Sequence, residues 1–328
     1  MSKIIEIKNL HKTFGDIKAV NDLSFCVKEG ELFAFLGENG AGKSTTINII
    51  CGELQKDSGI ILINGKDLDS DIINIKRSIG VVFQSSALDK SLSVIDNLES
   101  RAALYGIYGK EFKNRVKELS EILDFSSLLK RPLDKLSGGQ KRRIDIARAL
   151  IHKPKILILD EPTTGLDPQT RKLLWDVIDN LRKTEKMTVF LTTHYMEEAA
   201  EADYVIILDE GKITAEGTPF ELKNKYSCDY IYLYNIEEDV VKKFNLPYEI
   251  IKDAYKISIP STQDATELII KYPDAFIDYE ITKGKMDDVF LTVTGKKIGG
   301  DKWWWNLNTY LKEILNCSLK IKVCLSPH

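Results

Sequence analysis

The architecture of this chain can be inferred from one glycine-rich segment, Gly37-Glu38-Asn39-Gly40-Ala41-Gly42-Lys43-Ser44. Its spacing fits Gly-x-x-x-x-Gly-Lys-Ser/Thr, a pattern in which glycines turn backbone N–H groups toward phosphate oxygens. A short apolar run at 32–36 precedes the segment, and helical spacing follows it from Lys43 onward. A helix N-terminus in this place adds a favourable partial charge for anions. We therefore predict a phosphate-binding loop, with Lys43 on the β- and γ-phosphates and Ser44 on Mg²⁺.

Outward from this loop, apolar runs alternate with helical patterns over the first 225 residues. Such runs occupy 79–83, 156–159, 189–191 and 205–208. Strands buried on both faces read in this way, and their alternation with helices predicts an α/β fold with a mostly parallel sheet. Two further patterns differ from this core. Residues 4–27 read as antiparallel strands joined by a turn at 14–16, and residues from about 90 to 150 read as a helical insertion.

Two adjacent acids, Asp160 and Glu161, follow the apolar run at 156–159. Beside a phosphate loop, the first acid would hold Mg²⁺ directly or through water, and the second would polarise an attacking water. The alternative is that both acids cap the helix that follows. The phosphate loop favours the catalytic interpretation.

A second glycine-containing helix start is Leu136-Ser137-Gly138-Gly139-Gln140. Glycines at a helix N-terminus make another anion-binding site, to which Ser137 could donate its hydroxyl. An ordinary N-cap serine followed by a flexible turn has the same sequence. Physical reasoning from the residues leaves both interpretations open.

These segments, taken in chain order, resemble the motifs of the ATPase subunits of ABC transporters. Residues 37–45 resemble the Walker A loop, Gln84 the Q-loop, 136–140 the LSGGQ signature and 156–161 Walker B. Gly165-Leu166-Asp167 resembles the D-loop, and His194 the switch histidine. The resemblance implies a P-loop NTPase core of the ABC type, with an antiparallel β subdomain and a helical subdomain.

The resemblance also implies a role for each matched residue. Two such domains would pair head to tail, and each ATP would lie between the phosphate loop of one chain and the signature of the other. The implied catalytic residues are Glu161, His194, Gln84 and Lys43. The implied Mg²⁺ ligands are Ser44, Gln84 and Asp160. The implied ATP-binding residues are Phe14, Gly37, Glu38, Asn39, Gly40, Ala41, Gly42, Lys43, Ser44, Thr45, Ser137, Gly138, Gly139, Gln140 and Asp167.

Phe14 stands where the family stacks an aromatic ring on adenine, although a core or turn aromatic would read the same. Asp167 would lie at the dimer interface. Because the chain has a single Walker A loop, it brings half of two sites. We therefore expect a second ATP-binding subunit, with a homodimer as the simpler case and a heterodimer left open.

Several segments resemble those of the daunorubicin-resistance-like branch, which exports drugs and antibiotics. They are the residues at 163–168, 193–199, 217–219 and 286–295. This resemblance implies export of a drug-like, lipid or polysaccharide substrate through a separate polytopic membrane subunit. It implies a location at the cytoplasmic face of the cell membrane, reached through that subunit. A non-transport ABC ATPase acting on ribosomes or nucleic acid is the alternative, although such proteins usually carry two cassettes or long insertions.

Composition agrees with this assignment. The net charge is 46 − 49 = −3, so a global basic field for nucleic acid is absent and no nucleic-acid partner is expected. The five cysteines form no Cys-x-x-Cys pair, which argues against structural zinc and a disulfide framework. No apolar run approaches the roughly 18–20 residues that span a bilayer.

Beyond the ATP-binding domain, placed at 1–225, the sequence predicts a small α+β accessory domain at 226–297. Residues 298–328 lie outside the family pattern and carry Trp303, Trp304 and Trp305. One interpretation is a helix that binds a membrane surface or a partner, since residues 301–328 hold four lysines and two acids. The alternative, which we favour, is an extra helix and strand packed on the accessory domain, or a poorly ordered terminus.

Overall fold

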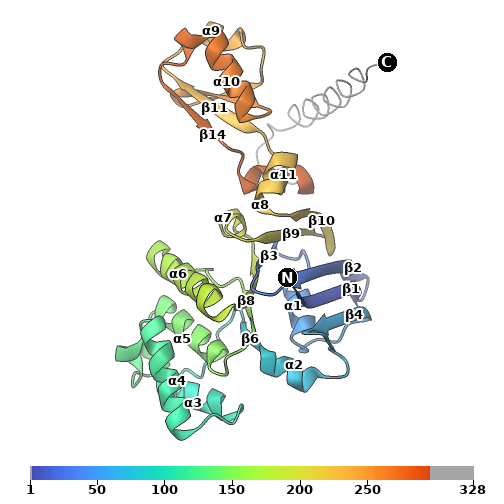
Figure 1. The fold of residues 1–328 in the computed structure, drawn as a ribbon, viewed down its shortest axis with the longest axis vertical. Helices are drawn as coiled ribbons and strands as arrows, with labels where there is room; N and C mark the ends of the chain where they lie inside the picture. The colour runs from blue at the N-terminus through green and yellow to red at the C-terminus, as the bar shows by residue number, and fades with distance from the viewer. Residues whose placement is uncertain (1, 296–328) are drawn as a thin grey trace. The chain divides into compact units, whose positions relative to one another are not determined.

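The computed structural model describes residues 2–295, and those up to Val293 form one compact unit. Three β-sheets organise these residues (Figure 1). The aromatic tail predicted at 298–328 lies outside the described residues. Among the described helices, none is both long and apolar enough to cross a bilayer.

The central sheet has six strands in the order β10-β9-β3-β8-β7-β6. The strand bounds are β3 Leu32–Gly37, β6 Ile79–Val82, β7 Ile156–Asp160, β8 Thr188–Thr193, β9 Tyr204–Asp209 and β10 Lys212–Gly217. Neighbours pair in parallel from β9 through to β6, and β10 runs antiparallel to β9. The predicted, mostly parallel α/β sheet is therefore confirmed.

Strand β3 explains why this sheet reads as continuous apolar runs. Successive side chains of a strand point to opposite faces. Leu32, Ala34 and Leu36 enter one hydrophobic cluster, while Phe33 and Phe35 enter another. Since both faces of the sheet are covered, every residue of β3 is buried.

Helices cover the two faces unequally. Helices α1 (Lys43–Ile50) and α2 (Ile72–Ser78) contribute to the cluster that contains Phe33. The other cluster takes in the helices of the predicted insertion and those that follow it. Their bounds are α3 Val94–Ala103, α4 Gly109–Ile122, η1 Ser126–Leu128, η2 Leu133–Lys135, α5 Gly138–Leu150, α6 Pro168–Glu185 and α7 Met196–Ala200.

An antiparallel sheet in the order β2-β1-β4-β5 covers the same face as α1. Its strands are β1 Lys3–Phe14, β2 Ile17–Lys28, β4 Ser58–Ile63 and β5 Lys66–Asp67. The rings of Phe25 and Phe33 stack with centroids 5.4 Å apart and so join this sheet to the central one. The antiparallel pair predicted at 4–27, with its turn after Phe14, is confirmed.

The C-terminal part of the unit begins with α8 (Pro219–Tyr226) and ends with α11 (Met286–Thr294). Between them lie β11 Asp229–Tyr234, α9 Glu238–Lys242, β12 Tyr248–Ile251, β13 Ala254–Ile259, α10 Thr262–Lys271, η3 Pro273–Ala275 and β14 Tyr279–Thr282. The order β12-β13-β11-β14 and the βαββαβ succession are those of a ferredoxin-like sheet. Helix α11 packs through Met286, Val289 and Phe290 in the hydrophobic cluster of the central sheet. The division at 225/226 stays a prediction.

Candidate nucleotide-binding site

The phosphate loop connects the carboxyl end of β3 to the first turn of α1. Gly42 caps α1 with a φ of 101°, a conformation that glycine adopts at little cost. A side-chain carbon at this position would lie 2.3 Å from the carbonyl oxygen of Ala19. The loop therefore requires glycine here, and residues 38–40 remain exposed.

Lys43 points back across the loop toward the acidic side of the site. Its ammonium donates to the carbonyl oxygens of Gly37 at 2.7 Å and Glu38 at 3.0 Å. It also lies 3.6 Å from Oε1 of Glu161, and the side chain is only 4% exposed. Burial lowers the pKa of Lys43, although the nearby carboxylates of Glu161 and Asp160 oppose this shift. The side chain is thus a partly desolvated donor at a site suited to phosphate.

Asp160 and Ser44 place two oxygen groups beside the loop. The Ser44 hydroxyl lies 3.4 Å from Oδ1 of Asp160, which also accepts a 2.5 Å hydrogen bond from the Thr192 hydroxyl. No cluster of three or more His, Cys, Asp or Glu side chains suited to a metal occurs within residues 2–295. Mg²⁺ is commonly held by one or two carboxylates together with substrate phosphates. The Ser44 and Asp160 oxygens fit such an ion.

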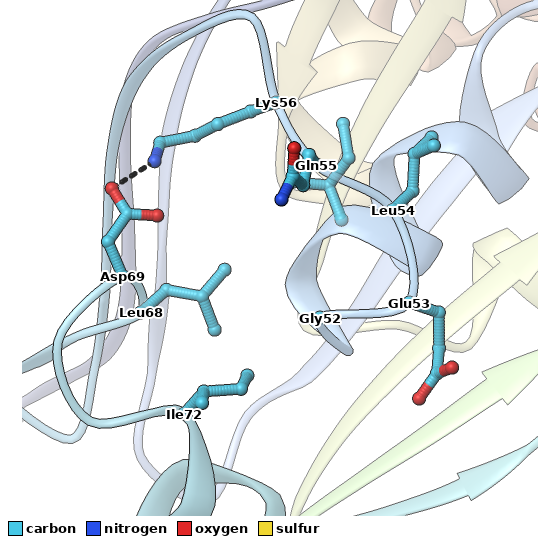
Figure 2. A pocket seen from close by; sticks show the side chains of 9 residues that line it. Gly52, Glu53, Leu54, Gln55, Lys56, Leu68, Asp69 and Ile72 are labelled. Atoms are coloured by element: carbon cyan, nitrogen blue, oxygen red, sulfur yellow. Dashed lines mark hydrogen bonds and ion pairs between the residues drawn. The ribbon is translucent and has the colours of Figure 1, made fainter.

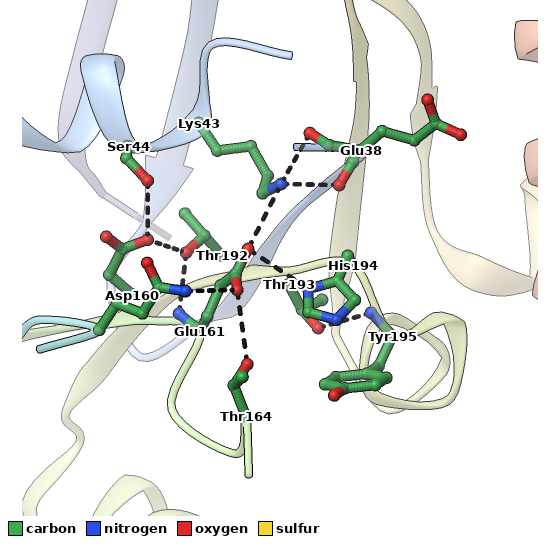
Figure 3. Close-up of polar contacts among 12 residues, drawn as sticks. Glu38, Lys43, Ser44, Asp160, Glu161, Thr164, Thr192, Thr193, His194 and Tyr195 are labelled. Atoms are coloured by element: carbon green, nitrogen blue, oxygen red, sulfur yellow. Dashed lines mark hydrogen bonds and ion pairs between the residues drawn. The ribbon is translucent and has the colours of Figure 1, made fainter. Parts of the chain in front are cut away.

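Glu161 is the point at which the predicted catalytic groups meet (Figure 3). Its Oε1 lies 3.3 Å from Nδ1 of His194 and 3.6 Å from the Lys43 ammonium. Its Oε2 accepts from Nε2 of Gln84 at 3.3 Å and from the Thr164 hydroxyl at 3.4 Å. One buried carboxylate therefore contacts groups from three separate motifs.

The backbone of Glu161 is held in an unusual conformation. Its φ is 45°, in the left-handed region that residues other than glycine rarely adopt. The N–H donates to the carbonyl oxygen and the hydroxyl of Thr192, both at 3.1 Å. These two hydrogen bonds therefore hold the turn after β7 against β8.

The signature residues form a second group with the D-loop. Ser137 caps α5, its hydroxyl accepts from the N–H of Gln140, and the Gln140 side chain accepts from the Ser137 N–H. A side-chain carbon at Gly139 would lie 2.7 Å from the side chain of Thr170. Thr170 in turn donates to Asp167 at 2.6 Å, and this hydrogen bond lowers the pKa of Asp167. Ser137, Gly138 and Asp167 are exposed.

Phe14 lies at the end of β1, where 48% of the side chain is exposed. The Lys12 ammonium lies 5.4 Å from the ring centroid. The next strand, β2, approaches the phosphate loop through Ala19, as noted above. An exposed ring in this hairpin is free to contact a ligand, which a core aromatic would not be.

Two residues of this region were missed by sequence reasoning. Thr192 bonds both acids, and its only sequence signal is a threonine pair at the end of a buried strand. Arg142 is buried, and its guanidinium donates to the carbonyl oxygens of Phe83, Pro162 and Asp160 at 2.6, 2.8 and 3.3 Å. It thereby ties the start of α5 to the backbone before Gln84 and around Glu161. Nothing in the sequence marks this arginine.

A separate hollow opens beside the ends of α1 and α2 (Figure 2). Lys56 and Asp69 form an ion pair at its rim. None of the predicted nucleotide-site residues is among its lining residues, which are Ile49, Gly52, Glu53, Leu54, Gln55, Lys56, Leu68, Asp69 and Ile72.

Comparison with known proteins gives consistent matches. A family model described as ABC transporter matches residues 20–164. The Nod factor export ATP-binding protein I of Burkholderia orbicola (strain AU 1054) is 35% identical over 300 residues, which cover 90% of this chain and 98% of that protein. The linearmycin resistance ATP-binding protein LnrL of Bacillus subtilis (strain 168) is 40% identical over 229 residues, covering 70% of this chain and 73% of that protein. Among solved structures, the dimeric ATP-binding cassette MJ0796 in a post-hydrolysis state with ADP and Pi has a TM-score of 0.60 and 29% identity, covering 66% of this chain and 98% of that one.

Proposed function

Because this chain belongs to the family of ABC transporter ATP-binding proteins and is an ATPase subunit of the exporter type, we propose that two copies hydrolyse ATP at shared sites to drive export. The observation that carries the proposal is the convergence of Lys43, Gln84 and His194 on the carboxylate of Glu161. Hydrolysis of a phosphoanhydride needs a positioned base, a cation for the phosphates and a group at the γ-phosphate. In this site the proposed base is Glu161 and the cation is Lys43. Gln84 and His194 are the groups proposed for the γ-phosphate.

In this proposal Glu161 polarises the attacking water and Lys43 neutralises the β- and γ-phosphates. Ser44 and Asp160 hold Mg²⁺, with Gln84 as a further ligand. His194 contacts the γ-phosphate, and Phe14 stacks on adenine. A preorganised site of this kind stabilises charge as it develops, without reorganising at the moment of reaction.

The two groups of motif residues support a composite site. Residues 38–40 of the phosphate loop are exposed and Glu161 lies beside Lys43 of that loop, while Ser137 to Gln140 and Asp167 lie together at the starts of α5 and α6. A head-to-tail dimer brings the second group of one chain to the first group of the other. The solved cassette MJ0796 is described as dimeric with ADP and Pi bound. We propose the same arrangement here, with residues 1–225 as the ATP-binding domain and 226–297 as the accessory domain.

The membrane part of the transporter is proposed to be a separate polytopic subunit. The relatives are named for Nod factor export and for linearmycin resistance. On this basis we propose a drug-like, lipid or polysaccharide cargo and a location at the cytoplasmic face of the membrane.

Co-purification tests this function. The Glu161→Gln variant, tagged and held in Mg-ATP, is extracted gently from membranes, and the proteins that accompany it are identified. A polytopic membrane protein in stoichiometric amount supports the proposal and points to the cargo. The matched control is Lys43→Ala, which should not form the ATP-held dimer. Recovery of ribosomes or nucleic acid without a membrane protein would contradict transport and favour a non-transport ABC ATPase.

A further inference from the structure

Glu198 on the short helix α7 is a buried carboxyl group for which the proposed function has no role. Only 3% of the residue is exposed. Its Oε1 accepts a hydrogen bond from the Thr163 hydroxyl. Within the described residues, its Oε2 is buried without a hydrogen-bond partner. The preceding residue, Glu197, offers a contrast, since its side chain is 87% exposed.

The hydrogen bond from Thr163 joins two segments of the proposed site. Thr163 is almost completely buried and lies two residues after Glu161, in the loop that leads from β7 to α6. The helix that carries Glu198, α7, begins two residues after His194. Glu198 therefore connects the helix that follows the histidine to the loop that carries the base.

The observed contact of Glu198 uses a side-chain oxygen as an acceptor. Burial raises the pKa of this carboxyl, and the hydrogen bond from Thr163 acts in the opposite direction. The amide oxygen of glutamine can accept the same hydrogen bond. Glutamine can therefore replace glutamate in this contact, whereas leucine fills a similar volume without an acceptor.

We propose that Glu198 is a positioning residue that sets the distance between Glu161 and His194, because its hydrogen bond with Thr163 holds α7, the helix after His194, against the loop that carries Glu161. The inference rests on the proposed function, because it assigns those two residues to hydrolysis. Glu198 acts through other residues and belongs to no segment that the proposal assigns to ATP binding. Its loss should therefore affect turnover much more than the binding of ATP.

Steady-state ATPase kinetics of the full chain test this role in four variants. For Glu198→Leu we expect kcat to fall about 10- to 100-fold, the range that a misplaced catalytic group produces, with KM for ATP changed less than about threefold. Thr163→Val removes the same hydrogen bond from the other side and should show the same separation of kcat from KM. Glu198→Gln should restore kcat to within about threefold of the wild type. The exposed neighbour provides the control, Glu197→Gln, which should match the wild type.

Two kinetic outcomes would overturn the proposal. One is a wild-type kcat in Glu198→Leu and Thr163→Val. The other is a Glu198→Gln variant as slow as Glu198→Leu, because hydrogen bonding would then not be the basis of the effect. Thermal unfolding checks that each variant is folded, and Thr163→Val decides the matter if Glu198→Leu does not fold.

A second measurement does not depend on hydrolysis. The chain has four histidines, and the imidazole resonances of His194 can be assigned by NMR with His194→Gln. Glu198→Leu should shift these resonances, while Glu198→Gln and Glu197→Gln should leave them in place. Unshifted resonances in Glu198→Leu would refute the positioning role. Absence of ATP hydrolysis by the wild type would instead refute the proposed function, and the NMR result would still decide the role of Glu198.

Discussion

Glu161, the proposed catalytic base, combines a strained backbone with a buried carboxylate. Its φ of 45° costs free energy that the surrounding contacts must offset, which is a common feature of active sites. The two hydrogen bonds from its N–H to Thr192 fix the turn, and the buried carboxylate faces Lys43 and His194. The unusual backbone conformation thus lies at the residue to which the proposal assigns the base.

The first prediction concerns Glu161→Gln. The amide keeps the size and the contact with Gln84, but it is a far weaker base. A positioned general base contributes about 10²–10⁴-fold in rate, so we expect turnover to fall by that factor while ATP binding is kept. Phosphate release and nucleotide binding, measured on the same preparation, check this. Turnover equal to that of the wild type would remove Glu161 from the role of base.

The second prediction concerns Lys43→Ala. The substitution removes charge-assisted hydrogen bonds to phosphate, each worth roughly 1.5–3 kcal/mol, so ATP should bind at least about tenfold more weakly. It also leaves the carbonyl oxygens of Gly37 and Glu38 without this donor. Equilibrium binding of a fluorescent ATP analogue measures the change. Wild-type affinity would count against the assignment of the loop.

The site residues differ in how far the sequence could reveal them. Glu161 and His194 were predicted because they follow short apolar runs in a fixed order of motifs, and the structure brings them together. Arg142 could not be, because its partners are main-chain carbonyl groups 59, 20 and 18 residues away, and these groups look alike in any sequence. Thr192 lies between these cases, since a polar residue at the end of a buried strand is a weak signal.

At the scale of elements, one short segment serves two purposes. The sequence left open whether Ser137 is an N-cap or a ligand group, and the capping box with Gln140 confirms the cap. The cap orients the first turn of α5 by accepting from the N–H of Gln140. The N-cap interpretation is thus confirmed, and the binding role of Ser137 stays a proposal.

Another element-scale feature is the junction of α3, α5 and β6, where His152 is held. Its ring stacks on Tyr105 with centroids 3.9 Å apart, and its Nε2 lies 3.1 Å from the carbonyl oxygen of Ile79. Burial lowers the pKa of His152 to about 4, and nearby arginines add to the shift. The native state therefore keeps this imidazole neutral at pH values where the unfolded chain protonates it.

The third prediction is a pH dependence of stability from His152. The unfolded histidine, with a pKa near 6.5, binds a proton before the native one does, so the contribution of His152 is complete above about pH 6.5 and decreases toward pH 4. Between pH 7.5 and pH 5 this amounts to about 2 kcal/mol. Urea unfolding at the two pH values measures it. In His152→Phe, which retains an aromatic ring against Tyr105 and cannot titrate, the pH difference should shrink by that amount, and an unchanged difference would contradict the assignment.

At the scale of the whole molecule, the central sheet was predictable because its strands are buried on both faces and read as apolar runs. Strands β4 and β10 were not identified, since they lie toward sheet edges and mix exposed with buried positions. Strand β5 has only two residues, neither of them buried. Helix α11 was assigned to the accessory domain by its place in the chain. Its contacts with the main hydrophobic cluster depend on tertiary packing, which local sequence patterns do not encode.

The last prediction tests whether two chains share each site. Lys43→Ala damages the phosphate loop, and Ser137→Arg damages the signature by adding a bulky cation at an exposed helix start. In a head-to-tail dimer that mixes the two variants, one site receives both defects and the other receives neither. Both proteins are made in the Glu161→Gln background, so that bound ATP is retained and can be counted. Each variant alone should retain almost no ATP in dimers, whereas the mixture should regain retention at one site for each mixed dimer. Mixtures no better than the separate variants would show that the phosphate loop and the signature of this protein do not meet across two chains.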